Sequence, residues 1–273
     1  MKQILKDVCE RYDFLNYEKL LEYPMPLNAP IITVAMLSFM RYDRLISTLK
    51  NLLSLHIPLN LCIRVQGTEL LTYFQKRDIL KFVDAFSGHD IQFTRGNHGT
   101  GTPRADVIER AYKHFDTPYI LTTDDDMLWK TESLIIQRYM LETNKELGAC
   151  SVTCTPHYNA WNIIGDKLVG RTPIPPFDIN VDASGSGTML FKRQILDNSE
   201  VVYDKNFYIG WADFDFCMQM RKKWKIGIID IPELKIKNNY DPKAKDYLAV
   251  RGCKQHNINS KKYFQKKWGL LIS

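Results

Sequence analysis

Three consecutive aspartates stand inside the stretch YILTTDDDMLW, residues 119–129. Aspartate is unfavourable in strands and adjacent carboxylates repel one another, so this run needs a compensating positive charge. Residues i and i+2 of an extended chain project to the same side, which predicts that Asp124 and Asp126 converge while Asp125 turns away. Paired carboxylates suit a hard divalent cation, Mn²⁺ or Mg²⁺, that keeps coordination positions for phosphate oxygens. An acidic surface turn, with Asp126 capping the next helix, explains the same residues, and the motif alone does not separate the two.

A glycine-rich segment, RGNHGTGTPRADVIERA, occupies residues 95–111. Thr102 is a good N-cap and Pro103 a good first helical residue, which predicts that a helix begins there. Free N–H groups and partial positive charge at a helix N-terminus favour an anion, and Arg104 adds a forked donor in the first turn. The segment lacks the GK[ST] of a P-loop and follows the third strand, where a dinucleotide fingerprint follows the first. A capped turn without a ligand is the alternative.

Two further aspartates follow a glycine and a tryptophan in YIGWADFDFCMQMRKKW, residues 208–224. Trp211 offers a flat apolar platform, and a carboxylate beside it in a partly dry pocket can act as a general base. Asp213 and Asp215 also lie near an expected helix start, where carboxylates are favoured. Capping is therefore the alternative interpretation, and it fits Asp215 better than Asp213.

The elements that must position these residues follow from the apolar pattern. Strands are expected at 31–37, 59–65, 91–95 and 119–123, with helices within 38–55, 69–86 and 105–115 between them, the first capped by Asp43. Strands that alternate with helices predict an α/β fold with a doubly wound, largely parallel sheet. Ligands of such sheets gather beyond the carboxyl ends of the strands, where the aspartate run lies. After about residue 150 the pattern loosens, with a helix expected within 212–224 and a strand at 225–231.

Composition places the chain among ordinary globular proteins. Its 273 residues are 45% hydrophobic and 25% charged, and the net charge of +6 favours anionic partners without choosing among nucleotide, nucleic acid and lipid. The N-terminus is charged throughout, no apolar run reaches the roughly 18 residues of a membrane helix, and six scattered cysteines favour buried free thiols. We therefore expect a cytoplasmic protein.

Taken in this order, the segments resemble the family 2 glycosyltransferases of the GT-A fold over residues 31–270. VAMLSFMRYDRL resembles that family's opening iPTYNRpdrL, with Leu37 and Met40 in place of its Pro and Asn. GTGTPRADVIERA resembles GxxxARNxgi, TTDDDM matches the DxD motif, and DASGSGTMLFKRQIL resembles the acceptor-side glycine segment. GWADFDFCMQMRK resembles GWggEDxDlclR, with Ala212 where Glu is usual.

The resemblance implies a GT-A domain, Rossmann-like with a mostly parallel sheet, over residues 29–273. Residues 1–28 form a short helical extension, about 29–150 the nucleotide-binding half, and about 151–273 the acceptor-binding half. The implied function is metal-dependent, inverting transfer of a sugar from a nucleoside diphosphate sugar, first a UDP-sugar, to an acceptor hydroxyl. The implied acceptor is a glycan, a glycoconjugate, a cell-surface polymer or a protein, and no nucleic acid is implied as a partner.

The same resemblance assigns residues. The donor nucleotide and diphosphate are expected at Ser38, Phe39, Arg41, Gln66, Arg104, Asp124 and Asp125. Mn²⁺ or Mg²⁺ is expected at Asp124, Asp126 and His256, with Asp213 as catalytic base and Gly185, Ser186, Gly187 and Trp211 at the acceptor. One departure stands out, because the family carries an acidic, nucleobase-contacting residue where this chain has Gln66 or, farther along, Glu69.

Three alternatives remain open from the sequence. A sugar nucleotidyltransferase also uses paired carboxylates, and such an enzyme would carry a glycine-rich loop straight after the first strand. This chain has no glycine there, in the segment MLSFMRYDRL. A basic nucleic-acid-binding module fits the net charge, although the most distinctive site is acidic. The tail NINSKKYFQKKWGLLIS is expected to dock as a helix through Tyr263, Phe264 and Trp268, or else to contact anionic lipid at the inner face of the membrane.

Overall fold

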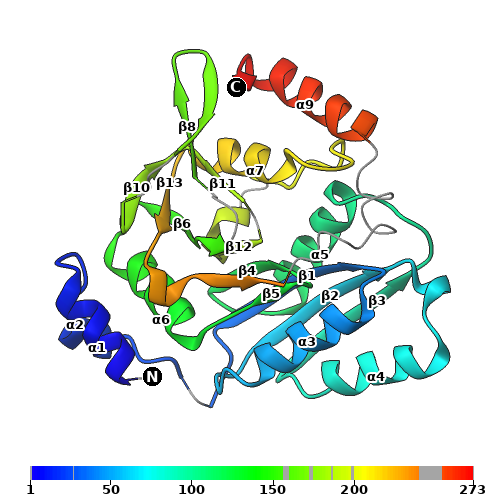
Figure 1. The fold of residues 1–273 in the computed structure, drawn as a ribbon, viewed down its shortest axis with the longest axis horizontal. Coiled ribbons are helices and arrows are strands. Elements are labelled where there is room, and N and C mark those ends of the chain that lie inside the picture. Colours follow the sequence, from blue (N-terminus) through cyan, green and yellow to red (C-terminus); the bar gives the residue numbers. More distant parts are fainter. Residues whose placement is uncertain are drawn as a thin grey trace.

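A computed structural model describes residues 2–26, 28–155, 160–171, 175–185, 187–197, 200–239 and 254–272. Its centre is an eight-stranded sheet with the order β10-β13-β6-β12-β4-β1-β2-β3 (Figure 1). The strands are β1 (Ile32–Phe39), β2 (Asn60–Gln66), β3 (Gly88–Thr94), β4 (Tyr119–Asp124), β6 (Leu147–Val152), β10 (Phe177–Val181), β12 (Thr188–Lys192) and β13 (Lys225–Ile229).

The sheet is mostly parallel on the side that carries the aspartates. β1 pairs in parallel with β2 and β4, and β2 with β3, whereas β12 runs antiparallel between β4 and β6. The register sets Phe39 opposite Gln66 and Leu37 opposite Asp124. Three predicted site positions thus meet at one edge of the sheet, because parallel strands end on the same side.

Helices cover both faces of the sheet (Figure 1). They are α3 (Tyr42–Leu53), α4 (Tyr73–Val83), α5 (Gly101–His114), α6 (Thr131–Thr143), α7 (Ala212–Met220) and α9 (Lys254–Trp268). The apolar faces of α3, α4 and α6 share one core, and those of α5, α7 and α9 share the other. Along β1, Val34 and Met36 belong to the first core and Ala35 to the second, as expected for a strand buried on both sides.

The strands and helices expected before residue 124 are present, and two caps are corrected. α3 begins at Tyr42, so Asp43 lies inside the first turn and does not cap it. α5 begins at Gly101, which puts Thr102 and Pro103 inside the helix. The glycine segment packs closely against the chain near Phe207, which places the start of α5 at Gly101.

Short strands form two smaller sheets, neither of which the apolar pattern predicted. One has the order β11 (Ala183–Ser184), β8 (Ala160–Ile164), β9 (Lys167–Gly170) and β15 (Leu271–Ile272). The other has the order β5 (Met127–Leu128), β14 (Ile236–Asn238) and β7 (Cys154–Thr155). Short 3₁₀ turns are η1 (Thr68–Leu70), η2 (Arg193–Leu196) and η3 (Pro232–Leu234).

The predicted N-terminal helices are α1 (Lys2–Arg11) and α2 (Tyr17–Leu21). They bury Leu5, Val8 and Leu20 in the same core as α3 and α6, so this extension packs on the domain. None of the helices in the described ranges is both long and apolar enough to cross a bilayer. Of the six cysteines, the five in described ranges are buried free thiols, as expected; Cys253 lies outside those ranges.

The C-terminal helix docks as predicted. Phe264 of α9 is fully buried, and Tyr263 and Trp268 pack against the same core. The carboxylate of Asp215 on α7 accepts hydrogen bonds from Trp268 Nε1 at 2.7 Å and from Lys267 Nζ at 3.0 Å. Both apolar burial and this buried ion pair therefore hold α9 against α7.

We expect Phe264→Ala to lower the free energy of unfolding by about 3–5 kcal/mol, because it removes a fully buried aromatic ring and leaves a cavity. Ile258→Ala, an exposed position on the same helix, is the matched control and should change stability by less than about 0.5 kcal/mol. Urea unfolding of both variants measures the difference. Equal stabilities would show that α9 does not belong to the core.

Candidate functional site

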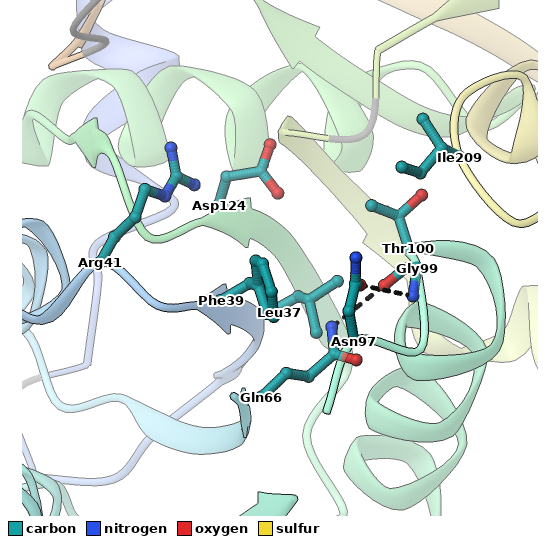
Figure 2. Close-up of a pocket in the computed structure, with 9 residues that line it drawn as sticks. All are labelled: Leu37, Phe39, Arg41, Gln66, Asn97, Gly99, Thr100, Asp124 and Ile209. Carbon is teal, nitrogen blue, oxygen red and sulfur yellow. Dashed lines mark hydrogen bonds between the residues drawn. The ribbon is translucent and has the colours of Figure 1, made fainter. Parts of the chain in front are cut away.

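A pocket opens at the carboxyl ends of β1, β2 and β4 (Figure 2). It is lined by Leu37, Phe39, Arg41, Gln66, Asn97, Gly99, Thr100, Asp124 and Ile209. Figure 2 shows Arg41 and Asp124 on one side, with Thr100, Gly99 and Ile209 on the other. Four residues predicted for the donor, from three segments of the chain, therefore line one hollow.

Two of the three aspartates are held by one arginine. Arg41 donates through Nη1 to Asp126 Oδ2 at 2.5 Å and through Nη2 to Asp125 Oδ1. Ser38 Oγ donates to the other oxygen of Asp125 at 2.6 Å, and Thr48 Oγ1 donates to the backbone carbonyl of Asp125 at 2.9 Å. Asp125 and Asp126 are both buried, so this end of the run is part of the protein interior.

The third aspartate faces the pocket. Asp124 Oδ1 accepts a hydrogen bond from Arg104 Nη2, and Arg104 also donates to the backbone carbonyl of Thr123 at 2.8 Å. The side chain of Asp124 is 29% exposed, whereas that of Asp126 is only 3% exposed. A Cβ at Gly187 would lie 3.0 Å from Asp124 Oδ2, so the absence of a side chain there keeps the carboxylate accessible.

The expected convergence of Asp124 and Asp126 is corrected by these contacts. Arg41 brings Asp125 together with Asp126, while Asp124 binds Arg104. Strand alternation ends at Asp124 because the chain turns before β5, so the i, i+2 rule does not extend across the turn. Asp126 does not cap a helix either, since α6 begins only at Thr131. The guanidinium groups of Arg41 and Arg104 offset the repulsion among the three aspartates. From the sequence, this compensating charge was expected from a metal ion.

Burial changes the acidity of the middle carboxylate. Loss of hydration raises the pKa of Asp125 to about 6, an effect that the charge of Arg41 opposes and that of Asp126 reinforces. Arg41 donates a hydrogen bond to each of the two buried carboxylates. Breaking either contact would leave an unpaired charge in the interior, which is costly. The arrangement therefore fixes the start of α3 to the end of β4.

Gln66 holds the glycine segment. Its Nε2 donates to the carbonyl of Gly99 at 3.0 Å, and its Oε1 accepts from the backbone N–H of His98 at 2.9 Å. An amide offers a donor and an acceptor together, whereas a carboxylate offers acceptors only. The departure from the family's acidic residue thus has a structural reason. Glu69 also serves this segment, because both its carboxylate oxygens accept from the N–H of Gly96.

The backbone amides of the glycine segment are engaged by the protein. The N–H groups of Gly96 and His98 bind Glu69 and Gln66, as described above for these side chains. The N–H of Gly99 donates to Asn97 Oδ1 at 2.9 Å. The N–H of Thr100 donates to the carbonyl of Tyr208 at 2.6 Å. These four groups hold the loop in place. All four precede Gly101, the first residue of α5, so the anion site expected at the helix N-terminus stays a prediction. Arg104, in the first turn of the helix, lies beside Asp124.

The segment before α7 packs directly on this loop. A Cβ at Gly99 would lie 2.2 Å from the carbonyl oxygen of Tyr208, and one at Gly101 would lie 1.8 Å from that of Phe207. Only glycine allows two backbones to approach this closely. This contact places Ile209 in the pocket wall. Two residues later, Trp211 has a left-handed backbone (φ 65°) and precedes the first residue of α7. Its Nε1 donates to Asn257 Oδ1 at 2.9 Å.

The two aspartates of α7 differ in their surroundings. Asp213 is half-buried in the first turn, where its Oδ1 accepts from the N–H of Phe214 at 3.1 Å. Asp215 is fully buried and binds Lys267, Trp268 and Gln219, so it does not cap the helix. The surroundings of Asp215 exclude it as the base, and the role of Asp213 as the base stays a prediction.

The remaining predicted residues lie at different places. His256 is in the first turn of α9 and packs against Tyr208, with 4.2 Å between ring centroids. Gly185 and Gly187 lie just before β12, and Ser186 lies outside the described residues. Across the ranges that the structure describes, no three side chains of the types His, Cys, Asp and Glu gather into a metal-binding group. The predicted set of Asp124, Asp126 and His256 is thus not assembled as a cluster.

Sequence reasoning did not assign five pocket residues: Leu37, Asn97, Gly99, Thr100 and Ile209. Leu37 could have been found from its place at the end of the first strand, and the next three from their position in the glycine-rich segment. Ile209 carries no local signal, because it reaches the pocket only through the packing of its segment on Gly99.

No protein-family model matches the sequence, and no curated protein is similar to it in sequence. Solved structures do resemble the fold. TarS 1–349 from S. aureus in complex with UDP-GlcNAc is 12% identical with a TM-score of 0.57, over 80% of this chain and 64% of that one. The mannosyltransferase PcManGT from Pyrobaculum calidifontis, in complex with GDP-Man and Mn²⁺, is 14% identical with a TM-score of 0.57, over 90% of this chain and 68% of that one.

These likenesses show that the chain has the GT-A fold, which confirms the expected fold class. The chain is shorter than the proteins it resembles. It spans 62% of TarS 1–349 in a second structure of that fragment, and 38% of the longer TarS structure.

We expect Gln66→Glu to lower the free energy of unfolding by about 1–3 kcal/mol, because the carboxylate cannot donate to the Gly99 carbonyl. Protonation of the introduced carboxyl restores the donor, so folding raises its pKa. The loss in the free energy of unfolding therefore shrinks as pH falls and grows as pH rises. Gln92→Glu is the control, since Gln92 only accepts from Arg110 and should change stability by less than about 0.5 kcal/mol. A deficit independent of pH would contradict this assignment.

Proposed function

We propose that this chain is a metal-dependent, inverting glycosyltransferase that moves a sugar from a nucleoside diphosphate sugar to an acceptor hydroxyl. One observation carries the proposal: Phe39, Arg41, Gln66 and Asp124, each predicted for the donor, line one pocket at the carboxyl ends of the strands. Pockets at this edge are where open α/β sheets bind their ligands. The shared fold with TarS and PcManGT supports the same reading.

The donor class follows from the chemistry of the pocket and from its neighbours. TarS was solved with UDP and UDP-GlcNAc, and PcManGT with GDP-Man. Arg41 lines the pocket, and Arg104 binds Asp124, which also lines it. Guanidinium groups suit phosphate oxygens, so positive charge at this pocket favours a diphosphate donor. A UDP-sugar is the first donor to test and a GDP-sugar the second. The acceptor we propose is a hydroxyl of a glycan, glycoconjugate or protein.

The residues fit a divalent cation at Asp124 better than at Asp126. Asp124 is a hard oxygen ligand that faces the pocket across from Gly187. Asp126 is almost fully buried and already binds Arg41, so it can join only if Arg41 yields that contact. When bound, a cation supplies positive charge to a diphosphate leaving group. His256 remains a predicted further ligand.

The chain's own residues account for the rest of the proposed chemistry. Arg104 orients Asp124 and adds positive charge where the leaving diphosphate gains negative charge. Asp213, at the start of α7, takes the proton of the acceptor hydroxyl as its oxygen bonds to the anomeric carbon and the bond to the diphosphate breaks. Direct attack from the face opposite the leaving group inverts that carbon. Trp211, Gly185 and Gly187 shape the acceptor side.

We expect Asp213→Asn to lower kcat by about 10²–10⁴-fold, because the amide cannot accept the proton, while the KM for the donor stays unchanged. Release of nucleoside diphosphate from UDP- and GDP-sugars measures the rate, with water as acceptor until a better one is found. Asp116→Asn, almost fully exposed, is the control for the same chemical change. A near wild-type rate removes Asp213 from this role. Release of pyrophosphate from a nucleoside triphosphate and a sugar 1-phosphate, tested in a separate reaction, would instead indicate a nucleotidyltransferase.

We expect Asp124→Ala to abolish Mn²⁺-dependent donor binding and Asp126→Ala to leave it largely intact. Both changes should lower the free energy of unfolding by about 1–3 kcal/mol, because each leaves a buried guanidinium donor, of Arg104 or of Arg41, without its acceptor. Calorimetric titration with UDP- or GDP-sugars, with Mn²⁺ and then with EDTA, measures binding, and urea unfolding measures stability. Loss of binding in Asp126→Ala together with unchanged binding in Asp124→Ala would reverse the two assignments.

A further inference from the structure

Exposed apolar side chains gather at the start of α4. Leu70, Tyr73 and Phe74 are 59%, 73% and 65% exposed. Within the described ranges, no other five consecutive residues hold three large hydrophobic side chains exposed to this extent. Single exposed apolar residues are normal on protein surfaces, but a cluster indicates a contact surface.

The core does not account for this cluster. α4 turns Ile79 and Val83 inward, and both are fully buried. Tyr73 and Phe74 instead contact each other at 5.8 Å between ring centroids, and the guanidinium of Arg77 lies 5.5 Å from the Phe74 ring.

The turn that carries the cluster is well ordered by its own hydrogen bonds. Thr72 Oγ1 accepts from the N–H of Gln75 at 3.2 Å, and Gln75 Oε1 accepts from the N–H of Thr72 at 2.9 Å. This capping box fixes the helix start. The aromatic pair is therefore presented on a defined helical turn.

Positive charge surrounds the aromatic pair. Lys76, Arg77 and Lys81 lie on the same helix, and Arg77 and Lys81 are exposed. The acidic neighbours are turned to other partners: Asp78 accepts from the Tyr42 hydroxyl at 3.1 Å, and Glu69 accepts from the N–H of Gly96. Aromatic and aliphatic side chains beside lysine and arginine match the interface of a bilayer that contains anionic lipids, with rings at the headgroup level and cations near the phosphates.

We propose that this α4 patch, made of Leu70, Tyr73, Phe74, Lys76, Arg77 and Lys81, docks the protein on an anionic membrane surface. Only three residues, 67–69, separate Leu70 from Gln66, which lines the pocket, so docking would bring the pocket close to the lipid surface. The proposal stands on the patch itself and does not depend on the proposed enzymatic function.

This surface differs from the one that the sequence suggested. In α9 the aromatic residues are taken up by the core, with Phe264 fully buried and Trp268 bonded to Asp215. That helix therefore offers charge without exposed aromatic rings. α9 lies at the top of the view in Figure 1 and α4 at the bottom, so variants of the two helices test separate surfaces.

Co-sedimentation of the full chain with phosphatidylcholine vesicles, with and without phosphatidylglycerol, tests the proposal. We expect binding to the vesicles with phosphatidylglycerol, weakened by added salt. Tyr73→Ser combined with Phe74→Ser should weaken binding at least about tenfold, because the inserted rings are lost. Lys76→Gln combined with Arg77→Gln should weaken binding and also reduce its dependence on salt.

Two controls match these changes. Lys262→Gln combined with Lys266→Gln removes the same charge from exposed positions of α9, and Ile164→Ser removes an equally exposed apolar side chain elsewhere. Both should bind vesicles as the unchanged protein does, and all variants should keep its thermal midpoint. The proposal is overturned if the unchanged protein does not sediment with the vesicles, if the α9 pair abolishes binding, or if sedimentation velocity shows that the Tyr73 and Phe74 changes dissociate a dimer.

Discussion

The structure depends on two guanidinium groups that hold three adjacent carboxylates at the end of β4. Arg41 stands just before α3, and Arg104 lies in the first turn of α5. Each arginine therefore ties the start of a helix to the same strand end, and the helices come from opposite faces of the sheet. Because an unpaired charge is costly when buried, the ends of these elements are fixed relative to one another. The accessible carboxylate of Asp124 is a product of this arrangement.

The opposite wall of the pocket is made by backbone contacts. Gln66 and Glu69 bind the main chain of the glycine segment, and that segment in turn lies against the carbonyls of Phe207 and Tyr208. Glycine is required there because a Cβ would overlap a carbonyl oxygen. The glycines therefore serve chain packing, which is a different use from the anion binding that glycine-rich loops often suggest.

The segment that begins α7 is joined to the C-terminal helix α9. The buried carboxylate of Asp215 binds side chains of α9, while Asp213, two residues earlier, remains half-buried at the helix start. Two aspartates in one motif thus have different physical environments, one set by packing and the other by its position at the helix end. The same helix start carries Trp211, whose ring touches Phe214 and Phe264.

The sequence by itself determined the order of the first four strands and their helices, because apolar periodicity and turn residues act locally. It also identified four of the nine pocket residues, Phe39, Arg41, Gln66 and Asp124, since strand ends are visible as the last apolar positions before polar runs. It missed α6, which is buried on most of its surface and has no polar stripe, and the short β8–β9 hairpin. Only the tertiary structure decided which arginine binds which aspartate, that Asp126 is buried, and that Ile209 reaches the pocket. These are contacts between residues far apart in the chain, and local pattern carries no information about them.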